Sequence, residues 1–230
     1  MEATALRHRP FLVAVGMLMC AALLGMWWDS SHAVPQVAHP STHVSTTPVA
    51  KPTPTAPALT AGQRKQLAYM EAHWNERDNP TFGNLDSVGG DCANFVSQTL
   101  LARGWTMNDG WFDHGGTDRT ESWGYVPAMD DYLAANAARL GLQRLTAADR
   151  DEFAVGDVVV FSWEGAADAA TDRDHVEVIS RITPHADGTI TVELASHNNY
   201  GLHRDLDEQI TKEHPGATFH VWHLTRDTNT

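Results

Sequence analysis

The sequence predicts an α+β domain in which N-terminal helices pack on an antiparallel sheet. Apolar residues recur at helical spacing between residues 60 and 140. After Asp151 the chain changes to continuous and alternating apolar runs, which are typical of strands. With 230 residues, the chain is long enough for one such domain and additional sequence.

Residues 1–33 have the pattern of an export signal. Two arginines precede an uncharged apolar run at 11–28, and Ser31 and Ala33 stand where a cleavage site carries small residues. The run is also long enough for a short membrane span, so a cleaved signal peptide and a signal anchor are both open. Either places the rest of the chain outside the cytoplasm, secreted or tethered to the membrane through this segment alone.

Residues 34–58 predict an extended spacer, because the segment is rich in proline, serine and threonine and has few large apolar residues. The domain is therefore expected at 59–230. It contains 27 acidic and 13 basic residues, because residues 1–58 hold two of the chain's 29 acids and three of its 16 bases. The resulting net charge of −14 argues against a nucleic-acid partner, which requires a basic surface.

Capping signals, periodicity and glycine stops predict three helices. Thr60 and Gln63 form a capping box for the first, which ends before Asn79, and Asp91 is the expected N-cap of the second. The second helix stops at Gly104, and the third covers about 121–140. The strands are expected at 158–161, at 175–182 and 189–194 as a hairpin, and at 218–224.

Cys92 is the one cysteine of the domain, since Cys20 lies in the export segment. Two cysteines exclude a disulfide-rich scaffold and a Cys₄ zinc site. A lone thiol in an exported protein is a candidate for a reactive group, and the first turn of a helix favours its thiolate form. Cys92 is therefore the candidate nucleophile.

A nucleophilic thiol needs a base and a group that orients the base. His175 is the best candidate base, because it begins a predicted strand after an acidic loop. His197, Asn198 and Asn199 stand where the next strand ends, and strand parity alone does not choose among them.

No metal or cofactor is expected. Asp168, Asp172 and Asp174 lack the glycine and the terminal glutamate of a calcium loop. His220 and His223 are three residues apart on a predicted strand and therefore face opposite sides.

The run GGDCANFVSQTL at 89–100 resembles the signature of the putative amidase domain group within the NlpC/P60 and CHAP-like, papain-fold cysteine peptidases. Further motifs follow in that family's order over roughly residues 62–224, among them GDVVVFSW at 156–163, DHVEVIS at 174–180 and SHNNY at 196–200. The resemblance implies a papain-like, NlpC/P60-type core with Cys92 as nucleophile, His175 as general base and acid, and His197 as the third residue.

Two departures from the family pattern stand out: an Ala-rich segment after Trp163, and Glu177 where a small or apolar residue is commoner. Near the nucleophile, Asp91, Asn94, Ser97 and Gln98 are expected to support the local structure. Trp123 is expected either to line the cleft or to pack in the core.

These residues favour an exported cysteine amidase or peptidase that hydrolyses an amide bond through a thioester, with cell-wall peptide as the expected substrate. A second hypothesis is an acyltransferase or transpeptidase, which forms the same thioester. The third is a surface binding domain of the same fold without turnover, which Glu177 beside the base leaves open.

Overall fold

The computed structural model describes residues 56–165 and 173–230. The chain divides into two compact units, Met1–Pro48 and Val49–Thr230, and all described residues belong to the second. The predicted export signal, most of the spacer, and Asp168 and Asp172 of the acidic loop lie outside the described residues. None of the helices in the described ranges is both long and apolar enough to cross a membrane.

A six-stranded sheet with the order β1-β6-β2-β3-β4-β5 forms the centre of the domain, and every neighbouring pair is antiparallel. The strands are β1 Leu142–Leu145, β2 Val158–Ser162, β3 His175–Pro184, β4 Ile190–Ser196, β5 Gly201–Asp205 and β6 Thr218–Leu224. The predicted α+β class, the hairpin and the closing strand are confirmed. Strands β1 and β5 were not predicted from the sequence.

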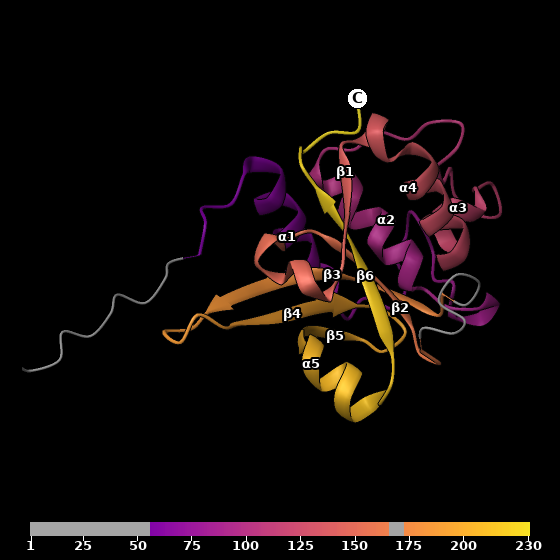
Figure 1. Ribbon diagram of the computed structural model, residues 1–230. Coiled ribbons are helices and arrows are strands. Elements are labelled where there is room, and N and C mark those ends of the chain that lie inside the picture. Colours follow the sequence, from indigo (N-terminus) through magenta and orange to yellow (C-terminus); the bar gives the residue numbers. More distant parts are fainter. Residues whose placement is uncertain (1–55, 166–172) are drawn as a thin grey trace, which may run out of the picture. The chain divides into compact units, whose positions relative to one another are not determined.

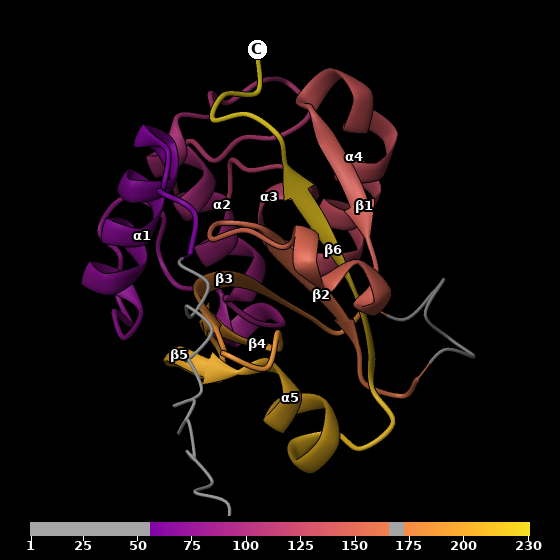
Figure 2. The ribbon, with the colours of Figure 1, turned by 60° about the vertical axis from the view of Figure 1, so that its left-hand side comes forward.

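The α-helices are α1 Ala61–His73, α2 Cys92–Arg103, α3 Glu121–Gly124, α4 Val126–Leu140 and α5 Leu206–Glu208. Short 3₁₀ helices span Asp86–Val88 and Ala147–Glu152, and a π-helical turn spans Gln209–Glu213. Figure 1 shows α2, α3 and α4 on one side of the sheet and α5 on the other. In Figure 2, α1 lies alongside α2, away from α4 and β1.

The sheet separates two apolar clusters, as strand alternation requires. Val158, Val160 and Val176 face Phe95 and other residues of α2 in the first cluster. The second cluster lies on the opposite face and includes Val159 and Leu206. Strand β3 is buried on both faces from His175 to Ser180, so its first residues are held on all sides.

The predicted third helix is interrupted at Tyr125, whose backbone is extended with φ −132° and ψ 122°. Pro127 explains the break, since its nitrogen has no hydrogen to donate to the carbonyl of Trp123 four residues earlier. That carbonyl accepts a 2.8 Å hydrogen bond from Ser97 Oγ instead. The prediction of one continuous helix over 121–140 was therefore wrong, although its C-terminal stop at Gly141 is confirmed.

The two predicted N-caps differ in the structure. The capping box of Thr60 and Gln63 is present at the start of α1. Asp91 occupies the N-cap position of α2, but its side chain accepts no hydrogen bond from the helix backbone. The carboxylate is engaged by other partners, so the first-turn amides of α2 are not capped by it.

Candidate active site

Cys92 is the first residue of α2 and is one of the residues that line a pocket. Its side chain is buried, with 5% of the residue exposed. The pocket has a volume of about 360 Å³ and is lined by residues from three parts of the chain: Val88, Gly89, Gly90 and Cys92; Glu121 and Gly124–Pro127; and Arg173 and Asp174. The thiol therefore stands where a substrate can reach a helix N-terminus.

The glycines before Asp91 bring the chain to this point. Gly89 and Gly90 have φ values of 123° and 127°, a region that residues with a side chain rarely adopt. A Cβ at Gly90 would also lie 2.4 Å from the side-chain nitrogen of Asn198. The GGDC motif thus allows a close approach between the start of α2 and the end of β4.

His175 begins β3 and is buried beside the nucleophile, with 6% of the residue exposed. Its Nε2 lies 3.0 Å from Glu177 Oε1. The Cys92 thiol also interacts with the imidazole and helps to raise its pKa. The structure thus brings the predicted nucleophile and base together.

The surroundings of His175 favour its protonated form. Burial alone lowers the pKa of the imidazole, but the hydrogen bonds with Cys92 and Glu177 outweigh it and raise the pKa to about 10. An imidazolium between a sulfur atom and a carboxylate can donate a proton to a leaving group. This is the arrangement that acyl transfer by a thiol requires.

Glu177 is fully buried and is held by three donors. Besides His175, Arg204 Nη1 donates to Oε1 at 3.0 Å and Gln209 Nε2 donates to Oε2 at 3.0 Å. Burial raises the pKa of the carboxyl, but His175, Gln209 and Arg204 together bring it below its usual value. Sequence reasoning noted Glu177 only as a departure from the family pattern. Its position two residues after His175 on a strand was the available signal.

His197 is not a partner of His175 in the described contacts. Its Nδ1 lies 2.6 Å from Asp91 Oδ2, its Nε2 lies 3.0 Å from the carbonyl oxygen of His73, and its ring stacks on Phe95. Both ring nitrogens are therefore used on the helix side of the sheet. His197 thus holds Asp91, the residue before Cys92.

The two asparagines offered as alternatives to His197 also bind elsewhere. Asn198 has a left-handed backbone with φ 75°, and its side-chain oxygen accepts a hydrogen bond from the backbone amide of Asp91. Asn199 directs its carboxamide oxygen at Arg204 when the amide is oriented to satisfy its hydrogen bonds. Neither contacts His175 among the described hydrogen bonds.

The family model described as a putative amidase domain matches residues 61–222. The chain belongs to this amidase domain family. Membership indicates amide hydrolysis. Curated proteins and solved structures gave no significant match, so the wider grouping with NlpC/P60 and CHAP-like enzymes and the papain-like core stay predictions.

Four polar residues in and before α2 make hydrogen bonds that hold the start of this helix. Asp91 Oδ1 accepts from the Leu85 amide and from Asn94 Nδ2, both at 2.8 Å, and Asn94 Oδ1 accepts from Trp123 Nε1 at 2.8 Å. Ser97 Oγ binds the Trp123 carbonyl, and Gln98 Oε1 accepts from Tyr69 Oη at 2.6 Å. Trp123 is fully buried and packs in the core; it is not among the residues that line the pocket.

The two histidines of β6, which the sequence predicted to face opposite sides, bind separate carboxylates. His220 Nε2 lies 2.8 Å from Asp130 Oδ1, and His223 Nδ1 lies 2.9 Å from Asp157 Oδ2. Within residues 56–165 and 173–230, no three His, Cys, Asp or Glu side chains converge in a way that could hold a metal ion.

Proposed function

We propose that this protein is a cysteine-dependent amide hydrolase with Cys92 as nucleophile, His175 as general acid and base, and Glu177 as the residue that orients His175. The observation that carries the proposal is the row of thiol, imidazole and carboxylate at the open N-terminus of α2. Glu177 takes the third place that the sequence offered to His197, Asn198 or Asn199.

The first half of the reaction forms a thioester. The Cys92 thiolate attacks the amide carbonyl carbon, and the oxygen becomes an oxyanion. The backbone amide of Cys92 at the start of α2 stabilises this charge, because Asp91 leaves the first-turn amides uncapped. The carbon–nitrogen bond then breaks, and the His175 imidazolium donates its proton to the departing amine.

The second half restores the enzyme. His175, now neutral, takes a proton from a water molecule while the oxygen of that water attacks the thioester carbonyl. The carbon–sulfur bond breaks, and the thiolate and imidazolium form again. The product leaves as a carboxylic acid, which loses its remaining proton to solvent and becomes a carboxylate. Glu177 keeps the ring in one orientation and stabilises its positive charge in both halves.

We place this activity outside the cytoplasm and assign it to an amide bond in cell-wall peptide. Three features support this assignment: the export pattern of residues 1–33, the spacer that follows it, and the resemblance of the sequence to NlpC/P60 and CHAP-like enzymes. Because the domain carries a net charge of −14, its substrate is expected to be the peptide part of the wall and not an anionic polymer.

Digestion of purified peptidoglycan by the full-length protein in H₂¹⁸O tests the proposal. Mass spectrometry should detect new amino groups and new carboxylates carrying one ¹⁸O, both absent with Cys92→Ala. Cys20→Ser is the matched control, since it removes the other thiol and should leave activity unchanged. Products with a new amide and no ¹⁸O would indicate an acyltransferase, and wall material retained but unchanged would indicate a binding domain.

A further inference from the structure

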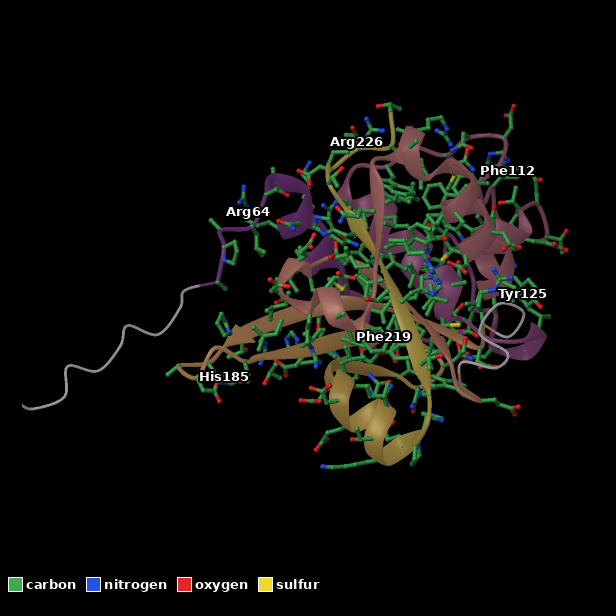
Figure 3. The ribbon with its side chains drawn as sticks, in the orientation of Figure 1. Arg64, Phe112, Tyr125, His185, Phe219 and Arg226 are labelled. Carbon is green, nitrogen blue, oxygen red and sulfur yellow. The ribbon has the colours of Figure 1, made fainter. Side chains whose placement is uncertain are left out.

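Two large hydrophobic side chains are conspicuously exposed in the described part of the chain, and both line the Cys92 pocket. Val88 is 75% exposed and Tyr125 is 59% exposed. Figure 3 shows Tyr125 at the surface. Exposed apolar side chains that gather at one place are typical of a binding surface, whereas scattered ones carry no such meaning.

Tyr125 holds this position because the helix is broken there. Its extended backbone turns the side chain out between α3 and α4, and its amide donates a 2.8 Å hydrogen bond to the carbonyl oxygen of Glu121. Glu121 and Tyr125 are therefore four residues apart across a single helical turn, and both line the pocket. An aromatic ring and a carboxylate thus stand at one wall.

The charges of the pocket are unbalanced. Arg173 is its one cation among the lining residues, and Asp130 at 3.1 Å and Asp131 at 2.5 Å already neutralise it. Glu121 has neither an ion pair nor a side-chain hydrogen bond among the described residues. Asp174 accepts only one side-chain hydrogen bond there, from the Trp163 amide at 2.7 Å. The pocket therefore presents uncompensated negative charge.

The side of the scissile bond that this pocket serves is argued from Cys92, which lines it. In the proposed reaction the acyl residue is the part of the substrate that becomes bonded to the Cys92 sulfur, so its side chain is the one assigned to this pocket.

Resting on the proposed function, we propose that this pocket selects a residue with an aliphatic side chain ending in an ammonium group, such as lysine, as the acyl donor. The methylene stem packs against Val88 and Tyr125, and the ammonium group pairs with Glu121 and with the face of the tyrosine ring. A neutral aliphatic side chain would use only the apolar part, and an acidic one would be repelled.

Labelling of the full-length protein with peptidyl chloromethyl ketones tests this inference without amide turnover. The Cys92 thiolate displaces chloride from the methylene carbon, and the thioether is counted by intact mass. Three probes differ only in the side chain beside the ketone: lysine, norleucine and glutamate. We expect the lysine probe to react about fivefold faster than the norleucine probe, and the glutamate probe to be slowest.

Substitutions test which residues cause the preference for the lysine probe. Glu121→Gln should bring the lysine-to-norleucine ratio close to one. Glu71→Gln removes an exposed carboxylate of α1 and should leave the ratio unchanged. Tyr125→Ala should slow both the lysine and norleucine probes relative to a glycine probe.

The outcomes separate this inference from the proposed function. Equal rates for the three probes, or a lysine preference that survives in Glu121→Gln, would overturn the inference even if amide hydrolysis is observed. Lysine-selective labelling in a protein that hydrolyses no amide would support the pocket assignment and contradict the proposed function. A preference that also disappears in Glu71→Gln would be an effect of net charge and would overturn the role of Glu121.

Discussion

His175 Nε2 and Glu177 Oε1 lie 3.0 Å apart on one face of β3. One residue of the strand, Val176, lies between them, so the backbone itself sets their spacing. Arg204 and Gln209 fix the carboxylate from β5 and from the π-helical turn, and the imidazole is left free to rotate only slightly. The predictions below follow from this pair and from the residues behind Cys92.

Replacement of Glu177 by glutamine should lower the pKa of His175, because a neutral amide no longer stabilises the imidazolium. In Glu177→Gln, the rates of Cys92 alkylation and of amide hydrolysis should fall off on the alkaline side at a lower pH than in wild type. We expect the rate of hydrolysis at neutral pH to fall about 10²-fold or more. The measurement is the rate constant of each reaction across a pH series.

Glu193→Gln is the control for this change, since Glu193 lies on the neighbouring strand and pairs with Arg181 at 3.3 Å. Circular dichroism should show that both variants fold. We call the part of the pH profile where the rate falls at high pH the alkaline limb. If the alkaline limb lies at the same pH in Glu177→Gln as in wild type, Glu177 has no role in the mechanism.

The stability of the protein should fall as pH rises from about 6.5 to about 10. The folded pKa of His175 is raised to about 10 from 6.5, so its contribution is complete below pH 6.5 and is lost as the ring deprotonates. Urea unfolding at several pH values should show that the free energy of unfolding falls less steeply with pH in His175→Gln than in wild type. The hydrogen bond to Asp157 raises the pKa of His223, so the contribution of His223 to stability is also lost as the pH rises. This loss is the same in both proteins and cancels in the comparison. Parallel curves for the two proteins would contradict the raised pKa of His175.

His197→Ala should act on stability more than on proton transfer. The substitution leaves the buried Asp91 carboxylate and the His73 carbonyl without this partner, so we expect a loss of about 2–4 kcal/mol in the free energy of unfolding. The alkaline limb of the alkylation profile should stay in place in the folded variant. If it moves as in Glu177→Gln, His197 orients the base, as the family resemblance implied.

Ser97→Ala should destabilise the fold by about 1–3 kcal/mol, since the carbonyl of Trp123 and the indole of Trp111 both lose a buried partner. Denaturant unfolding measures the loss. The exposed Ser87→Ala on the 3₁₀ helix is the matched control and should change stability by less than about 0.5 kcal/mol. Equal effects of the two substitutions would mean that the Trp123 carbonyl does not depend on Ser97.

The elements that sequence reasoning predicted correctly are those with local signals. Helix α2 begins and ends where Asp91 and Gly104 indicated, and β6 has the predicted bounds Thr218–Leu224. Strands β1 and β5 are short and largely half-exposed or exposed, so neither gives a clear apolar pattern. The break at Tyr125 carried a local signal in Pro127, but the apolar periodicity continued across it.

The site was predicted in part for the same reason. The position of Cys92 at a helix start and of His175 at a strand start can be read locally. The choice of a third residue depends on which groups satisfy His197, and its partners Asp91 and His73 are more than 100 residues away in sequence. Glu177 was noted only as a departure from the family pattern, because its contacts with Arg204 and Gln209 arise only in the folded chain.

The proposed base and carboxylate lie on one strand, so their separation is fixed by that strand. The separation that can vary is the one between Cys92 and His175, which lie on different elements. His175 and Glu177 lie on β3, while Cys92 lies on α2, so the packing of this helix on the sheet sets the separation between the sulfur and the imidazole. Substitutions in the layer between Phe95 and Val176 are therefore the ones that would tune turnover from a distance, by opening or closing the gap between sulfur and imidazole.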